Sequence, residues 1–143
     1  MQLVRLIYVS VMKMEYDKEE IKKILRMARS KNARNNITGL LCYDPKFFLQ
    51  YIEGPRDAIN KLYASINRDE RHTDVTLLEY AEIEERLFGN WSMGFTPSAE
   101  LDKSILDEYA GDDGKVDPFS FSAKQALSFL VEVVALKTLP HDE

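Results

Sequence analysis

The sequence contains little cysteine and histidine and has no long apolar run. One cysteine, Cys42, and two histidines occur among its 143 residues. A single thiol cannot form an internal disulfide, and no metal-ligand spacing is visible. The longest apolar stretch, "ALSFLVEVVALK", is interrupted by Glu132 and is shorter than the roughly 18 to 20 residues of a membrane helix. These absences argue against a disulfide scaffold, a metal centre and a membrane span.

An excess of basic charge is also missing. Lys and Arg number 19 against 24 Asp and Glu, which gives a formal net charge of −5. A surface that collects nucleic acid phosphates is normally basic. The first residues, "MQLVRLIYVS", enter a strand pattern directly and show no cleavable signal. We therefore expect a cytoplasmic protein that binds neither nucleic acid nor a membrane.

The composition that remains is that of an ordinary globular domain. Hydrophobic residues make up 45% and charged residues 30%, and the length suffices for one substantial core. Alternating apolar residues predict strands, and apolar residues spaced three or four apart predict helices. The predicted order is βαββαββ, with strands at 3–11, 35–43, 46–54, 74–88 and 90–97, and helices at 17–32 and 54–72.

This order is typical of a ferredoxin-like α+β sheet with two helices on one face and one extra strand. Residues 101–110 and 122–137 predict two further helices, joined by the segment "GDDGKVDP". We expect these C-terminal helices to cover the other face, because "FFLQYI" is apolar on both sides. The expected organisation is a domain at 1–97 followed by a two-helix extension at 98–143.

The third strand carries an unexpected amide, Gln50. A buried amide without partners costs about 1 to 3 kcal/mol. If the first and third strands are neighbours, Tyr8 and Gln50 share the face beneath the two helices, where phenol and amide can form a donor and acceptor relay. The simpler interpretation of this pair is that Gln50 satisfies a backbone carbonyl and that Tyr8 fills the core.

Further segments give a more specific pattern. In order, "RLIYVS", "NARNNITGLLCY", "FFLQYIEG", "RDERHTDV" and "NWSMGF" resemble the BLUF photoreceptor domains, named for blue light sensing using FAD. The resemblance runs from about Leu3 to Phe95. The tail is similar to that of the short, stand-alone PixD-like members. The resemblance implies a blue-light photoreceptor with noncovalently bound FAD, or alternatively FMN or riboflavin, between the two helices.

The resemblance also implies roles for single residues. Tyr8 would donate an electron and a proton, and Gln50 would change its hydrogen bonds. Asn32 would hold the pyrimidine end of the flavin, although Asn is also a common helix cap. The remaining flavin contacts would be made by Ile24, Ile66, Arg71 and His72. Without the resemblance, the two isoleucines are core residues, and the basic pair is a solvated part of a loop.

Trp91 and Met93 are expected on one face of the last strand, since alternate residues of a strand share a face. By resemblance they would relay the signal from Gln50 to the tail. A Trp and a Met in these positions also fill cores in many proteins. Which of the two lies beside Gln50 is not decided by the sequence.

The resemblance implies a homo-oligomer with a downstream protein partner, such as a response-regulator-like protein, and no enzymatic activity. Acylphosphatase chemistry on this scaffold needs an anion-binding loop after the first strand, where "SVMKMEYDKEE" is acidic. An RNA-binding module needs an exposed aromatic face, which the tail would cover. The main alternative is a flavin-free domain of the same fold that binds protein partners.

Overall fold

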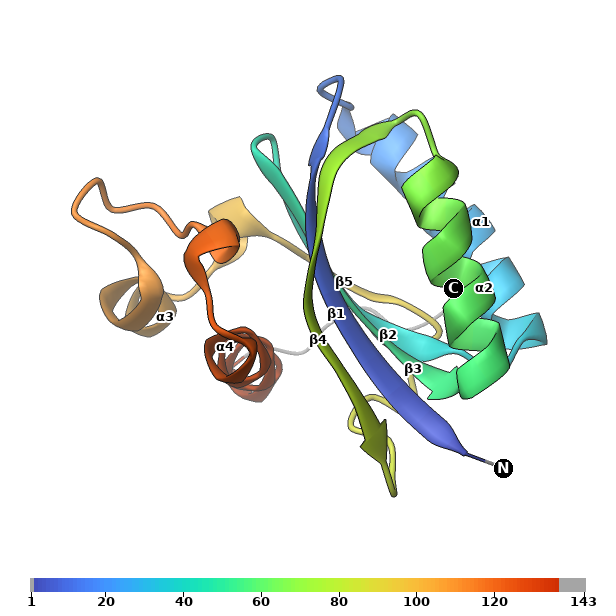
Figure 1. The fold of residues 1–143 in the computed structure, drawn as a ribbon. Coiled ribbons are helices and arrows are strands. Elements are labelled where there is room, and N and C mark those ends of the chain that lie inside the picture. The colour runs from blue at the N-terminus through green and yellow to red at the C-terminus, as the bar shows by residue number, and fades with distance from the viewer. Residues whose placement is uncertain (1, 137–143) are drawn as a thin grey trace.

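The computed structural model describes residues 2–136 and has one sheet between two helical layers (Figure 1). Its strands are β1 (Leu3–Met12), β2 (Thr38–Asp44), β3 (Phe47–Pro55), β4 (His72–Ile83) and β5 (Gly94–Pro97). Its α-helices are α1 (Lys18–Arg34), α2 (Arg56–Arg68), α3 (Lys103–Tyr109) and α4 (Ala123–Leu136). Short 3-10 turns lie at Ser98–Glu100 and Pro118–Ser120.

The strand order in the sheet is β4-β1-β3-β2-β5. β1 is antiparallel to both β3 and β4, whereas β5 is parallel to β2. The predicted ferredoxin-like arrangement, with the first and third strands at the centre, is confirmed. In this register Tyr8 is directly paired with Gln50.

The two faces of the sheet form two separate cores. α1 and α2 lie on one face and α3 and α4 on the other, as predicted (Figure 1). On the α1 and α2 side the sheet contributes Val4, Leu6, Tyr8, Leu41, Phe48 and Ile52. On the tail side it contributes Ile7, Val9, Leu40, Leu49 and Tyr51, which pack against Phe129, Leu130 and Val133 of α4. All of β3 is buried, which explains why its sequence is apolar on both faces.

The start of α1 follows from its sequence. The Asp17 carboxylate accepts a hydrogen bond from the Glu20 backbone N–H, and the Glu20 side chain accepts one from the backbone N–H of Asp17. This reciprocal capping box satisfies two backbone donors that the first turn leaves free. Ile21 and Leu25 then face the sheet and are buried.

Several predicted boundaries are corrected. The last strand begins at Gly94 rather than at residue 90, and α2 ends at Arg68 rather than at residue 72. The chain turns after α2 because the Asp69 carboxylate accepts a hydrogen bond from the backbone N–H of Arg71. The last predicted residue of the final helix, Lys137, and the rest of the predicted extension lie outside the described residues.

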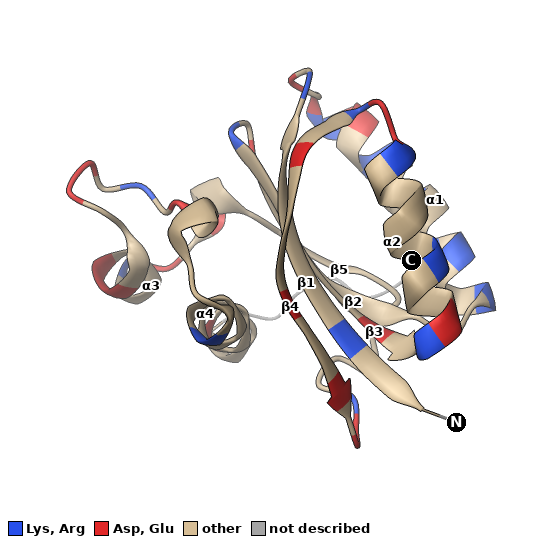
Figure 2. Cartoon of the chain, viewed as in Figure 1, with Lys and Arg blue, Asp and Glu red and all other residues tan. Residues whose placement is uncertain are grey.

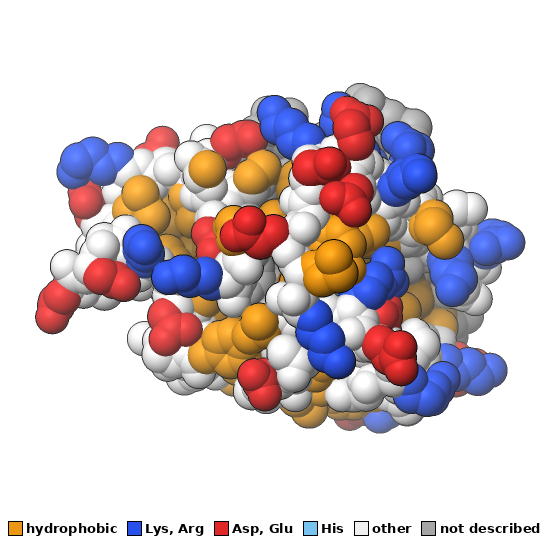
Figure 3. Space-filling view, turned by 90° about the horizontal axis from the view of Figure 1, so that it is seen from above, with side chains coloured by type: hydrophobic (Ala, Val, Ile, Leu, Met, Phe, Trp, Pro, Cys, Tyr) orange, Lys and Arg blue, Asp and Glu red, His pale blue; other side chains and the backbone are white. Residues whose placement is uncertain are grey.

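Charged side chains are distributed unevenly over the layers. Figure 2 marks Lys and Arg positions along α1 and α2, and mainly Asp and Glu positions on α3 and on the loop that follows it. In the view of Figure 3, acidic and basic side chains are interspersed around small apolar areas. Within residues 2–136, no helix is both long enough and apolar enough to cross a bilayer.

Candidate functional site

A cavity of about 390 Å³ lies between the sheet and the two helices α1 and α2. This volume lies within the usual range of small-molecule sites, roughly 300 to 1,000 Å³. The cavity includes all seven side chains predicted to contact a flavin: Tyr8, Ile24, Asn32, Gln50, Ile66, Arg71 and His72. The fold thus brings these residues together from five segments of the chain, and their contact with a flavin stays a prediction.

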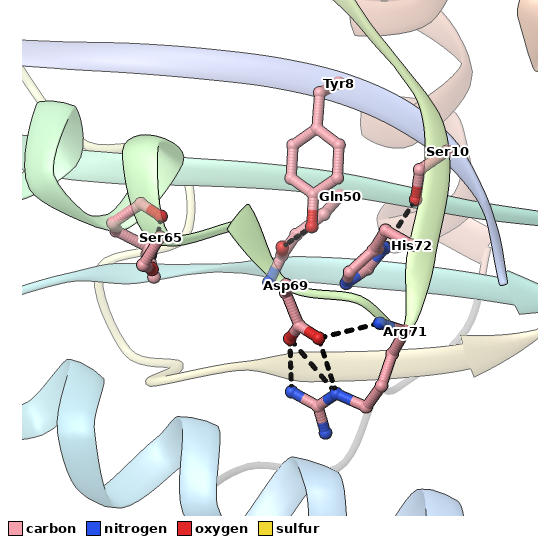
Figure 4. A network of polar contacts seen from close by, with 8 residues as sticks. Tyr8, Ser10, Gln50, Ser65, Asp69, Arg71 and His72 are labelled. Carbon is pink, nitrogen blue, oxygen red and sulfur yellow. Dashed lines mark hydrogen bonds and ion pairs between the residues drawn. The ribbon is translucent and has the colours of Figure 1, made fainter. Parts of the chain in front are cut away.

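Tyr8 and Gln50 are hydrogen-bonded on the sheet side of this cavity (Figure 4). The Tyr8 hydroxyl donates to Gln50 Oε1 at 2.5 Å, and Gln50 Nε2 donates to the sulfur of Met93 at 3.4 Å. Burial, followed by the neighbouring Tyr63, raises the pKa of Tyr8 well above its usual value of 10.0. Tyr8 therefore keeps its proton in the ordinary pH range and remains the donor in this chain.

His72 lies on the neighbouring strand beside the Tyr8 ring, at a centroid distance of 6.4 Å. Its Nδ1 is 2.7 Å from the Ser10 hydroxyl, and its ring contacts Phe48 edge to face at 5.0 Å. Burial lowers the pKa of His72 below 6.5, and the nearby Asp69 opposes that shift. The imidazole is thus held in a fixed orientation and is favoured in its neutral form.

Arg71 forms an ion pair with Asp69 where α2 ends (Figure 4). Arg71 Nη2 is 2.6 Å from Asp69 Oδ2, and Nε is 3.0 Å from both carboxylate oxygens. These hydrogen bonds lower the pKa of Asp69 to about 2 and raise that of Arg71. Arg71 is exposed at the rim of the cavity, with 49% of its side chain accessible, and its ion pair with Asp69 holds the guanidinium in place.

Asn32 lies in the last turn of α1 and is buried. Its Nδ2 donates to the backbone carbonyl of Ser92 at 2.9 Å. The residue that caps α1 is Asn35, so the helix-cap interpretation applies to Asn35 and not to Asn32. One turn earlier, Arg29 Nε donates to the Met93 carbonyl at 3.0 Å. Helix α1 thus holds the segment that precedes β5.

The prediction that Trp91 and Met93 share one face of the last strand is wrong. Both precede β5, and the chain bends at Ser92 and Met93. Met93 is packed in the core beneath α1 and α2, whereas Trp91 packs against the core on the tail side and stacks on Phe88. Alternate residues share a face only where the chain is extended. Here side chains of α1 donate hydrogen bonds to the backbone carbonyls of Ser92 and Met93, which a neighbouring strand would otherwise bind. Met93 is the residue beside Gln50.

Three further residues of the site, Arg29, Ser10 and Ser92, were not predicted from the sequence. Arg29 and Asn32 are three residues apart on α1 and therefore lie on the same helical face. That spacing was the available signal that two polar side chains point at one partner segment. Ser92 acts through its backbone carbonyl, which no side-chain pattern reveals.

The residues of the cavity suit a flat ring system with one polar edge. Apolar side chains of both helices and of β3, namely Ile24, Leu62, Ile66 and Phe48, provide walls for apolar faces. The amides of Asn32 and Gln50 offer hydrogen-bond donors and acceptors to carbonyl and ring-nitrogen atoms. This combination fits the isoalloxazine group of a flavin.

Comparison with known proteins assigns the family. Residues 3–94 match the BLUF family, described as sensors of blue-light using FAD. The chain is 37% identical over 92 residues to the beta subunit of photoactivated adenylate cyclase from Euglena gracilis, and 38% identical over 89 residues to its alpha subunit. These matches cover 64% and 62% of this chain but only 11% and 9% of the relatives. The chain belongs to the BLUF family of blue-light flavin sensors.

Solved structures extend the similarity beyond the matched residues. The dark state of BlrB, described as a BLUF protein, has a TM-score of 0.76 at 31% identity, and the match covers 94% of this chain and 96% of BlrB. The ground state of BlsA has a TM-score of 0.81 at 24% identity and covers 99% and 93%, which supports the fold. Klebsiella pneumoniae BlrP1, solved with FMN and cyclic diGMP, matches 74% of this chain and 29% of its own, with a TM-score of 0.66 at 29% identity.

Proposed function

We propose that this protein senses blue light through a flavin held noncovalently in the cavity, and that light switches the hydrogen bonds of Gln50. The observation that carries the proposal is the continuous chain from the Tyr8 hydroxyl through the Gln50 amide to the Met93 sulfur, beside a cavity with flavin-compatible walls. Seven side chains would contact the flavin: Tyr8, Ile24, Asn32, Gln50, Ile66, Arg71 and His72.

The photochemical step would use the phenol and the amide. When bound, the flavin supplies blue-light absorption and, once excited, the capacity to take up an electron and a proton. Tyr8 would give an electron to the excited flavin and its proton to Gln50 Oε1, the atom that already accepts its hydrogen bond, while Gln50 would pass an N–H proton on to the flavin. The electron and a proton return to Tyr8 when charge recombines, so no residue is consumed. Gln50 is left rotated or in its other tautomer, and this new hydrogen-bond pattern is the product.

The signal would leave the cavity through Met93. A rotated Gln50 amide turns its oxygen toward the sulfur, so the N–H···S contact is lost. The backbone of Ser92 and Met93 leads directly into β5, which pairs with β2. β5 is followed by the turn at Ser98–Glu100 and then by α3 and α4. A shift of Met93 would therefore change the position of β5 and of the tail. Trp91, which precedes β5 as Met93 does, would be the second residue of this relay.

The same proposal assigns two parts to the chain. Residues 1–97 would form the flavin-binding domain, and the extension that begins at residue 98 would transmit the signal; its described part, to residue 136, covers the opposite sheet face. Its contacts in a homo-oligomer, or with a partner such as a response-regulator-like protein, would change with light, and output would come from these contacts rather than from catalysis in this chain. FAD is the expected cofactor, as in the family description. FMN and riboflavin are alternatives, and FMN is named with BlrP1.

A pair of glutamine variants tests the photochemical part of the proposal. Gln50→Ala is expected to bind flavin but to show no light-induced red shift, because the switching amide is gone. Gln125→Ala, at an exposed position of α4, is the matched control and should keep the shift. A full red shift in Gln50→Ala would contradict the mechanism. A colourless protein that takes up no added flavin would instead favour the flavin-free interaction domain.

A further inference from the structure

Glu53 is a buried carboxylate to which the proposed photochemistry gives no role. It lies on β3, three residues after Gln50, and its side chain points to the tail side of the sheet, where it is fully buried. Oε1 accepts hydrogen bonds from the Tyr51 hydroxyl and the Leu87 backbone N–H, both at 2.9 Å. Oε2 accepts from the Thr38 hydroxyl at 2.9 Å and the Phe88 backbone N–H at 2.8 Å. Four donors satisfy both oxygens of a charge that would otherwise be costly to bury.

The loop between β4 and β5 also donates side-chain hydrogen bonds to groups around Glu53. Arg86 Nη1 donates to the Thr38 hydroxyl at 2.9 Å and to the Glu53 carbonyl at 3.2 Å. Its Nη2 donates to the Asn36 carbonyl at 2.7 Å. We call this set the Glu53 clamp: the side chains of Thr38, Glu53 and Arg86 with the backbone N–H groups of Leu87 and Phe88.

The clamp is connected to Met93 by a short, tightly packed segment. The Phe88 ring stacks on Trp91 at a centroid distance of 5.9 Å, with planes only 8° apart. The Trp91 backbone N–H donates to the Phe88 carbonyl at 3.1 Å, and the Trp91 carbonyl accepts from the Gly39 N–H at 3.0 Å. Two residues later, Met93 meets Gln50. Strand β3 therefore holds this loop at two points, through Glu53 and through Gln50.

We infer that Glu53 is a positioning residue for the light switch and sets where the Met93 sulfur lies relative to Gln50. This inference depends on the proposed function. Hydrogen bonds to a carboxylate are stronger than neutral ones, whereas a thioether sulfur is a weak acceptor. When Gln50 rotates, the weak contact to Met93 breaks and the bonds at Glu53 persist. The loop at residues 86–88 stays fixed, and displacement is confined to Met93 and β5.

Glu53→Gln tests this role. The variant replaces one carboxylate oxygen by an NH₂ group, which faces donors rather than acceptors and cannot satisfy them. Tyr8 and Gln50 are unchanged, so flavin binding and the red shift should persist. Hydrogen exchange of residues 84–93 in the dark protein should accelerate roughly tenfold or more, as expected for lost bonds to a charged acceptor. Thermal recovery should slow about threefold or more, because Met93 must find its dark position from a loosened loop.

Combining Glu53→Gln with Met93→Leu tests whether Glu53 acts through the position of the Met93 sulfur or only supports the fold in general. If Glu53 acts through the sulfur, Glu53→Gln has no further effect on recovery in the Met93→Leu protein, a complete coupling of the two changes. Tyr51→Phe, which leaves both loop N–H bonds in place, and Glu79→Gln, which removes a partly buried carboxylate paired with Arg5 on β1, are controls with unchanged recovery.

Unchanged recovery and exchange in Glu53→Gln would overturn the inference. An equal slowing in the Met93→Leu background would overturn it too, since Glu53 would then act independently of the sulfur. If Glu53→Gln does not fold, Arg86→Gln removes the reciprocal half of the clamp at a less buried position, with the same expectations. A wild-type protein without a light response would refute the proposed function, while exchange at residues 84–93 would still decide whether Glu53 holds the loop.

Discussion

Tyr8 and Gln50 occupy directly paired positions of the two central strands, and the Tyr8 hydroxyl donates to Gln50 Oε1 at 2.5 Å. Both side chains are buried on the same sheet face, next to the cavity. The pairing fixes the distance between them through the backbone of β1 and β3, so neither helix has to move for the contact to form. A rigid pair of this kind is suited to a reversible proton transfer that is repeated in every light cycle.

Tyr8→Phe should abolish the light response and leave flavin binding intact. The ring still fills its place, but the donor to Gln50 Oε1 is lost, at a stability cost of about 1 to 3 kcal/mol for an unsatisfied buried group. Absorption spectra before and after blue light, with a thermal melt, measure both effects. Tyr63→Phe is the control, because its ring packs on Tyr8 at 5.8 Å without a place in the relay. A photoactive Tyr8→Phe protein would refute the role of the phenol.

Met93→Leu and Met93→Ala should separate the sulfur from the volume it fills. Met93 is fully buried, so truncation to Ala is expected to cost about 2 to 5 kcal/mol. A change to Leu keeps the volume and should cost less than about 1.5 kcal/mol. Because the acceptor for Gln50 Nε2 is lost, the dark state is destabilised in both variants, and recovery after illumination should slow. Equal recovery in Met93→Leu and wild type would show that the sulfur has no part in the switch.

Asn32→Ala should weaken flavin affinity by roughly tenfold or more, because it removes an amide at the cavity together with its hydrogen bond to the Ser92 carbonyl. Asn35→Ala is the matched control. That residue caps α1 at an exposed position, where its Nδ2 donates to the Lys31 carbonyl. Flavin titration of the two apoproteins gives the comparison. Equal flavin affinities of the two variants would show that Asn32 has a purely structural role.

Acidification should destabilise the protein through His72. Burial lowers its pKa in the folded state below the ordinary 6.5, so just below that pH the unfolded chain binds more protons. Stability is therefore retained above about pH 6.5 and falls as the pH decreases toward the lower folded-state pKa. Thermal melts of the apoprotein at about pH 7.5 and 5.5 should differ less in His72→Gln than in wild type. An identical difference in both proteins would exclude His72 as the cause.

Phe129→Ala should lower stability without altering the photochemistry. Phe129 is fully buried between α4 and the sheet and contacts the Tyr109 and Phe121 rings at 5.2 and 5.4 Å. Its truncation is expected to cost about 3 to 5 kcal/mol. The proposed flavin cavity lies on the opposite sheet face, so the size of the red shift should persist. Ser128→Ala, at an exposed position of α4, is the control. A lost red shift at unchanged flavin occupancy would contradict the separation of the two faces.

The central relationship was predictable because it depends on local periodicity. The alternation of side chains along a strand places Tyr8 on one face of β1 and Gln50 on one face of β3. The order of strands and helices, βαββαββ, makes these two strands neighbours. The first conclusion follows from residues close in sequence, and the second follows from the strand order that this fold class imposes. The position of the seven cavity side chains follows from the same two rules, together with the resemblance to a known family.

The path of residues 90–93 was not predictable in the same way. Its conformation depends on Arg29 and Asn32 of α1, which take the Met93 and Ser92 carbonyls, and on the Gly39 N–H, which takes that of Trp91. The acceptors are distant backbone carbonyls, and the spacing of Arg29 and Asn32 does not identify them. Glu53 is a similar case, because an acidic residue near a strand end ordinarily faces solvent, whereas this buried carboxylate accepts four hydrogen bonds.

The absorption spectrum of the purified, flavin-loaded protein tests the central claim most directly. It should be recorded in the dark, after blue light, and again through recovery. We expect a flavin spectrum that shifts slightly to longer wavelength on illumination and returns fully in the dark, because light changes hydrogen bonds and consumes no group. Permanent bleaching of the flavin band, or a spectrum that light leaves unchanged, would contradict the Tyr8 and Gln50 switch.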